Sequence, residues 1–97
     1  MTQRYILSPR AQSDLDEIWH YTESRWGIGQ AETYIRQLAR DIKAIAAKPT
    51  LARACPEVRH EYYKFKSGSH LIFLRRNKDD IEIIRILHER MDFEQHL

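Results

Sequence analysis

The stretch IRILHERMD, residues 84 to 92, places four polar residues directly behind a run of branched aliphatic side chains. His88, Glu89, Arg90 and Asp92 include the groups that supply the acid, the base and the anion clamp of an active site. The same residue types also suit the polar rim of a surface that contacts another protein. We call residues 88–92 the closing segment.

Metal-free RNA cleavage is the reaction that these residue types fit best. It needs a base for the 2′-hydroxyl, an acid for the leaving oxygen, and cations that stabilise the transition state. The candidates on the predicted strands are Arg59, Lys64, His70, Arg75, Arg85, His88, Glu89 and Arg90.

Strand alternation predicts that Arg85 and His88 point to opposite sides of the sheet, which weakens a site built from both. One face would carry Ile84, Ile86, His88 and Arg90, and the other Ile83, Arg85, Leu87 and Glu89. In the structural alternative, His88 makes a hydrogen bond at the strand end and Arg85 pairs with an acidic residue of a helix.

Other chemistries find little support in the motifs. Ser67 and Ser69 flank a turn glycine and do not form a nucleophile elbow. The five histidines show no zinc-binding spacing, so we expect neither a metal nor another cofactor. The single cysteine, Cys55, is interpreted as a small half-buried residue rather than a catalytic thiol.

Length and composition indicate one globular domain spanning residues 1–97. Of these 97 residues, 42% are hydrophobic and 31% charged, and the sequence shows neither a signal peptide nor a membrane span. We therefore expect a cytoplasmic protein. The net charge is +2, but residues 36–66 alone carry eight basic and three acidic groups. This basic middle could attract an acidic partner, or it could simply be a solvated surface.

The first half of the chain predicts one short strand and two helices. Residues 4–7 are strand-like, and Ser8-Pro9 is a typical helix start. An apolar stripe at Leu15, Ile18, Trp19, Thr22 and Trp26 marks the first helix, with Asp14 on another face. Gly27 and Gly29 should end that helix. A second stripe runs from Ala31 to Ala46 and stops before Pro49.

The second half predicts three strands joined by short turns. They span residues 58–66, 70–76 and 81–88, with the segment PTLARACPE as a loop before them. The last strand is apolar on both faces, which is typical of a central strand. The predicted fold class is α+β, with the order β-α-α-β-β-β and a helical hairpin packed on a small, mostly antiparallel sheet.

The segments SGSHLIFLR and IEIIRILHERMD, with the opening RYILSPRAQSDLDEIWHYTESRWG, resemble the ParE branch of the RelE/ParE toxin superfamily. The resemblance extends over nearly the whole chain. It implies the toxin of a bacterial type II toxin–antitoxin module. The implied partner is a ParD-like antitoxin, whose DNA-binding part would provide the only link to operator DNA. ParE-type toxins are understood to poison DNA gyrase, whereas RelE-type relatives use the fold for ribosome-dependent mRNA cleavage.

The sequence after His88 favours the ParE type, because three acids and one arginine make an unfavourable surface for RNA. We therefore expect a protein that acts by contact and is not an enzyme. The alternative is an endoribonuclease with His88 or Arg90 in its site. The residues expected to contact the target are His88, Arg90, Met91 and Asp92. Those expected to contact the antitoxin are Arg36, Arg40, Lys43, Lys64 and Arg75.

Overall fold

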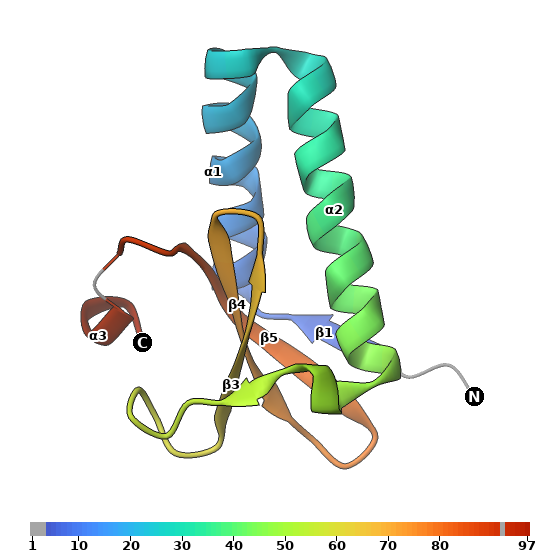
Figure 1. Cartoon of the computed structure of the whole chain (residues 1–97), viewed down its shortest axis with the longest axis vertical. Helices are drawn as coiled ribbons and strands as arrows, with labels where there is room; N and C mark the ends of the chain where they lie inside the picture. The colour runs from blue at the N-terminus through green and yellow to red at the C-terminus, as the bar shows by residue number, and fades with distance from the viewer. Residues whose placement is uncertain (1–3, 92) are drawn as a thin grey trace.

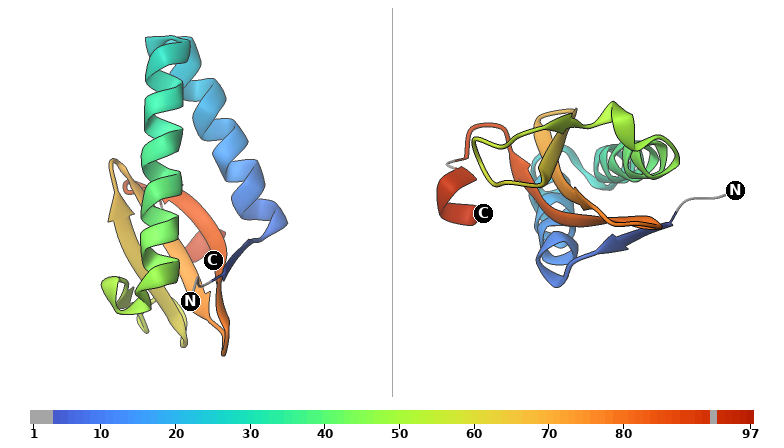
Figure 2. Two further views of the ribbon diagram at one scale, coloured as in Figure 1. Left: turned by 90° about the vertical axis from the view of Figure 1, so that its right-hand side faces the viewer. Right: turned by 90° about the horizontal axis from the view of Figure 1, so that it is seen from below.

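A computed structural model describes residues 4–91 and 93–97 of the chain. Two long helices, α1 (Pro9–Trp26) and α2 (Ile28–Ala47), form a hairpin that packs against a five-stranded sheet (Figures 1 and 2). The distal part of the hairpin extends beyond the strands (Figure 1). Among residues 4–91 and 93–97, no helix is long and apolar enough to cross a membrane.

The sheet has the strand order β1-β5-β4-β3-β2. Its strands are β1 (Arg4–Leu7), β2 (Arg53–Ala54), β3 (Tyr62–Ser67), β4 (His70–Arg76) and β5 (Asp80–His88). β1 pairs with β5 in parallel, and the other pairs are antiparallel. The predicted α+β class, the helical hairpin and the mostly antiparallel sheet are therefore confirmed.

The local signals at the start of the chain produce the predicted boundaries. Ser8 caps α1 through its side-chain oxygen, which accepts a hydrogen bond from the Ala11 amide at 3.0 Å, and Pro9 occupies the first helical position. Gly27, with φ of +91°, separates the two helices, and α2 already begins at Ile28. Gly29 therefore belongs to α2 and does not help to end α1.

Three short elements escaped prediction, and one strand was placed too early. A single 3-10 turn, η1 (Pro49–Leu51), is followed by the two-residue strand β2 where a loop was expected. β3 starts at Tyr62 instead of residue 58, because the chain from Cys55 to Tyr62 closes on itself through main-chain hydrogen bonds. The short helix α3 (Phe93–His96) lies near the C-terminus. None of these elements is long enough for a periodic pattern.

The core lies on both faces of the sheet. Between the sheet and the helices, Ile72, Leu74, Ile83 and Ile86 pack with the apolar stripe of α2. On the other face, Phe73, Leu87 and Cys55 are fully buried beneath partly buried side chains that include Leu97. Cys55 is thus more deeply buried than expected, and burial raises the pKa of its thiol.

An irregularity in β5 changes which residues share a face. The pairing of β5 with β4 shifts between Phe73 and Leu74, so that Arg85 lies opposite Phe73 and Ile83 lies opposite Leu74. Ile84 is the extra residue of this β-bulge. As a result Ile83 joins Ile86 on the helix side, and the predicted grouping of Ile83 with Arg85 is wrong.

Candidate functional site

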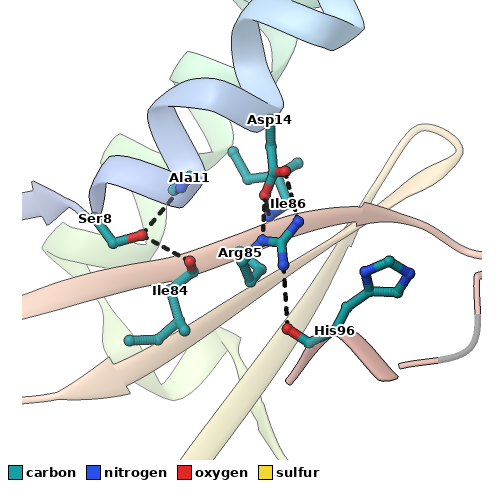
Figure 3. Close-up of polar contacts among 7 residues, drawn as sticks. All are labelled: Ser8, Ala11, Asp14, Ile84, Arg85, Ile86 and His96. Carbon is teal, nitrogen blue, oxygen red and sulfur yellow. Dashed lines mark hydrogen bonds and ion pairs between the residues drawn. The ribbon is translucent and has the colours of Figure 1, made fainter. Parts of the chain in front are cut away.

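The edge of β5 that faces α1 is the structural basis of the site. β1 pairs with β5 only as far as Ile83, and no strand among the described residues pairs with the rest of β5 on that side. The main-chain groups at this edge are bound by helix α1 and its cap instead (Figure 3). The Ser8 amide donates to Ile83 O at 3.0 Å, and the Ser8 hydroxyl donates to Ile84 O at 2.7 Å.

Asp14 completes the set of hydrogen bonds that seals this edge of β5. Its Oδ2 accepts a hydrogen bond from the Ile86 amide at 2.9 Å, and both carboxylate oxygens accept hydrogen bonds from Arg85 at 2.8 Å (Figure 3). The side chains of Arg85 and Asp14 are only 14% and 9% exposed. Hydrogen bonding to Asp14 raises the pKa of Arg85, so this guanidinium is permanently charged and permanently paired.

The pairing of Arg85 with an acidic helix residue is confirmed, but the position of its partner was predicted wrongly. Asp14 was placed on a solvent face of the first helix, and it is 7% exposed. The buried face of α1 contains Ala11, Asp14, Ile18 and Thr22, whereas Trp26, expected in the apolar stripe, is 69% exposed. Helical spacing alone places Asp14 with Ala11 and Ile18, but a carboxylate is rarely assigned to a core without a known partner.

Beside this seal lies a cavity of about 500 Å³, which we call the strand-edge pocket. One wall is a face of α1, and the opposite wall is formed by the ends of β4 and β5 and the chain beyond them. Its lining residues are Asp14, Glu17, Ile18, Tyr21, His70, Arg85, Ile86, Leu87, His88, Met91 and His96. The volume falls in the range of ligand-binding pockets and can hold a large side chain.

A hydrogen-bonded chain fixes the polar end of the pocket. The Tyr34 hydroxyl accepts from the Ser69 amide at 2.9 Å and lies 2.6 Å from His70 Nδ1. The hydroxyl has one proton to donate, and its donation to Nδ1 would place the ring proton of neutral His70 on Nε2. Tyr34 passes so close to the β3–β4 turn that a Cβ on Gly68 would lie 2.7 Å from its oxygen.

His70 is held neutral in this arrangement. Burial, assisted by the neighbouring His88, lowers the pKa of His70 to about 4. The His70 ring also makes edge contacts with Tyr34 and with His88, at centroid distances of 5.5 and 5.4 Å. Burial likewise raises the pKa of Tyr34, so its hydroxyl stays protonated.

The closing segment turns away from the sheet at His88. The Arg90 amide donates to His88 Nδ1 at 3.2 Å, so the expected hydrogen bond of His88 at the strand end is present. His88 and Met91 line the strand-edge pocket, whereas the Arg90 side chain is exposed outside its lining. Glu89 is exposed and forms an ion pair with Lys66 at 3.3 Å. Asp92 lies outside the described residues.

Arg85 and His88 come from opposite faces of β5 and still line one pocket. His88 pairs with His70 on the helix side, and Arg85 lies opposite Phe73, a residue of the far-side core. The open strand edge lets the Arg85 side chain reach around to Asp14. The predicted separation of faces is therefore correct, but it does not keep the two side chains apart.

Comparison with known proteins identifies the family. The family model described as "ParE toxin of type II toxin-antitoxin system, parDE" matches residues 5–93. The chain belongs to the ParE toxin family. It is 47% identical to Toxin ParE1 of Mycobacterium tuberculosis, over all of both chains. It is 44% identical to Toxin ParE1 of Caulobacter vibrioides, over 96% of each chain.

Solved structures show that the chain has the RelE/ParE-like fold. A chain of the chromosomal ParDE toxin–antitoxin system from P. aeruginosa superposes with a TM-score of 0.79 at 16% identity, covering 90% of this chain and 96% of that one. The YoeB dimer from Staphylococcus aureus gives a TM-score of 0.64 at 14% identity, covering 92% and 99%. The ParE family thus shares this fold with a YoeB-type toxin.

The basic residues expected to contact the antitoxin of this ParE-family toxin lie on two surfaces. Arg36, Arg40 and Lys43 are exposed and line a shallow groove on α2, together with Thr33 and Ala39. Lys64 shares the far side of the sheet with Phe73, and Arg75 is paired with Glu82 at 2.8 Å. The five cations therefore do not form one continuous patch.

Several residues of the pocket were not identified from the sequence of this ParE-family chain. Glu17, Tyr21 and His96 line the pocket, and Tyr34 is hydrogen-bonded to the lining residue His70. These residues come from three different elements, and only the tertiary structure brings them together. A partial signal existed for Tyr34, whose place in the α2 stripe puts a hydroxyl in a half-buried position. Among residues 4–91 and 93–97, no group of three His, Cys, Asp or Glu side chains is placed to hold a metal ion.

The neutral state of His70 predicts a pH-dependent stability. In the unfolded chain a histidine has a pKa near 6.5, and in the folded protein the pKa of His70 is about 4. Between these values the unfolded chain binds more protons, so the free energy of unfolding falls as the pH drops through this range. We expect the free energy of unfolding to fall by about 1–2 kcal/mol because of His70, a value that allows for its partial exposure.

Urea unfolding at several pH values between about 7 and 4 measures this effect. The control is His70→Gln, whose side-chain oxygen can still accept the Tyr34 proton. The variant should lose less stability than the wild-type protein on acidification. Parallel curves for the two proteins would contradict the assignment of a neutral, buried His70.

Proposed function

We propose that this ParE-family toxin stops growth by poisoning DNA gyrase through protein–protein contact, without chemistry of its own. ParE-type toxins are understood to act in this way, and the chain is similar to two ParE1 toxins over nearly its full length. The proposal places the protein in the bacterial cytoplasm, where gyrase acts. The proposed target contacts are His88 and Met91, which line the pocket, and their sequence neighbours Arg90 and Asp92.

The observation that carries this proposal is that the imidazole and guanidinium groups at the end of β5 are already engaged in hydrogen bonds. Nδ1 of His70 is hydrogen-bonded to the Tyr34 hydroxyl, and Nδ1 of His88 accepts a hydrogen bond from the Arg90 amide, so both nitrogens are already engaged. Arg85, the arginine of the pocket, is neutralised by Asp14. Apolar side chains such as Ile18, Leu87 and Met91 complete the lining, which suits contact better than catalysis.

Ribosome-dependent mRNA cleavage is the alternative function. The fold shared with YoeB and the presence of His88 and Arg90 at the strand end favour it. RNA would, however, have to approach Asp14 and Glu17 in the pocket and Glu89 beside it. Asp14 and Glu89 are each paired with a cation, whereas the unpaired Glu17 would repel phosphate. Arg85, the pocket arginine that could offset it, already binds Asp14.

Purified gyrase separates the two functions. We expect the wild-type protein to inhibit supercoiling and to accumulate cleaved DNA, and we expect its effect to weaken at least about tenfold when His88→Ala and Arg90→Ala are combined. The matched control is Lys78→Ala, an exposed residue of the β4–β5 turn, at the opposite end of β5 from His88. Unchanged supercoiling, together with mRNA cut on translating ribosomes, would support the nuclease instead.

We further propose that a ParD-like antitoxin neutralises the toxin and contacts the basic groove of α2. Arg36, Arg40 and Lys43 present three cations along one helix, which suits an acidic segment that folds on binding. A segment that wraps around the toxin can also reach Lys64 and Arg75 on the far side of the sheet. The P. aeruginosa structure is of a ParDE system, in keeping with such a partner.

Charge reversal tests this contact. Arg40→Glu combined with Lys43→Glu should weaken antitoxin binding at least about tenfold in moderate salt, because two attractive interactions become repulsive. Arg4→Glu combined with Lys78→Glu makes the same charge change at exposed positions outside the proposed contacts and should have little effect. Isothermal titration calorimetry measures both affinities. Full affinity of the groove variant would refute the contact.

A further inference from the structure

The wall that α1 contributes to the strand-edge pocket is a regular helical ridge. Asp14, Glu17, Ile18 and Tyr21 follow one another at spacings of three, one and three residues, so they lie on one face of α1. Ridges of this kind form the grooves into which a second helix packs. Tyr21 is 60% exposed at the distal end of the ridge, and Met91 is 43% exposed across the pocket. Large apolar side chains therefore remain accessible on both walls.

Of the carboxylate and guanidinium groups that line the pocket, one has no ion-pair partner in the described part of the chain. Asp14 and Arg85 neutralise each other, and burial keeps His70 uncharged at neutral pH. Glu17 is exposed on the same ridge and makes no hydrogen bond or ion pair with any residue that the structure describes. An apolar pocket with one unpaired carboxylate at its rim favours an apolar group that carries a nearby cation.

We propose that the strand-edge pocket receives an amphipathic helix of the target, which inserts one large apolar side chain and places a Lys or Arg against Glu17. This inference rests on the proposed gyrase function and adds Glu17 and Tyr21 as specificity-determining residues. The apolar side chain packs against Ile18, Tyr21 and Met91, where interface anchors are usually found.

The two partners should bind at different surfaces and carry opposite charges. The basic groove of α2 suits an acidic antitoxin segment, and the pocket beside α1 suits a basic helix of the target. Substitutions at Glu17 should therefore change inhibition of gyrase without changing the affinity for the antitoxin.

Supercoiling inhibition by full-length variants tests the inference. Glu17→Lys should raise the half-inhibitory concentration about tenfold and Glu17→Gln about threefold, because reversal adds repulsion to the lost attraction. Tyr21→Ala should raise it about tenfold through loss of packing. Asp16→Lys makes the same charge change on the adjacent residue, which does not line the pocket, and should stay within about twofold. Thermal unfolding of each variant confirms that the fold is intact.

The results distinguish failure of the inference from failure of the proposed function. If wild-type protein inhibits gyrase and folded Glu17→Lys inhibits it equally well, the inference fails and the proposed function stands. Equal losses for Glu17→Lys and Asp16→Lys would show a diffuse charge effect and would also refute it. If Glu17→Lys weakens antitoxin binding but not gyrase inhibition, the pocket belongs to the antitoxin and the inference fails. A wild-type protein without effect on gyrase would overturn both.

Discussion

The arrangement of the helices on the sheet depends on the hydrogen bonds that the Asp14 carboxylate accepts from β5. β5 extends five residues beyond its pairing with β1, and an open main-chain edge inside a small protein must find other hydrogen-bond partners. Asp14 supplies one of these partners to the Ile86 amide, and its own charge is compensated by Arg85. Removal of either charged group would leave the other buried and unpaired, which typically costs about 3–5 kcal/mol.

The same interaction shapes the functional surface. A third Arg85 donor, Nη1, bonds to the main-chain oxygen of His96 at 3.1 Å, so one guanidinium connects α1, β5 and α3 (Figure 3). Arg59 holds the next carbonyl, that of Leu97, at 2.7 Å. The chain after His88 is therefore anchored at both ends, at the strand and at α3. Main-chain amides of Arg90 and Met91 donate to His88 and hold this turn beside the pocket, which lowers the entropy lost when a partner binds.

Those parts of the fold that depend on neighbouring residues in the sequence could be predicted, and those that depend on distant residues could not. The cap at Ser8, the break at Gly27, the α2 stripe and the strand His70–Arg76 follow from local chemistry and periodicity. The bulge at Ile84 depends on the partner strand, and no local signal marks it. The burial of Asp14 depends on Arg85, which is 71 residues away.

The residues of the candidate site also divide into those with a local sequence signal and those that only the fold brings together. His88 and Met91 were predicted because they follow an apolar strand, and the structure places both at the strand-edge pocket. The α1 wall, including Glu17 and Tyr21, appears only once the helix lies against β5. The proposed mode of action thus rests less on the residue types of the closing segment than on the edge where it leaves the sheet.

Amide hydrogen exchange at Ile86, followed by NMR, tests the role of this edge most directly. If Asp14 seals the edge of β5, the Ile86 amide of the wild-type protein should be as strongly protected as amides of the central strand β4. In Asp14→Ala its protection should fall much more than that of the β4 amides. An Ile86 amide that exchanges in the wild-type protein as fast as those of exposed turns would contradict the account.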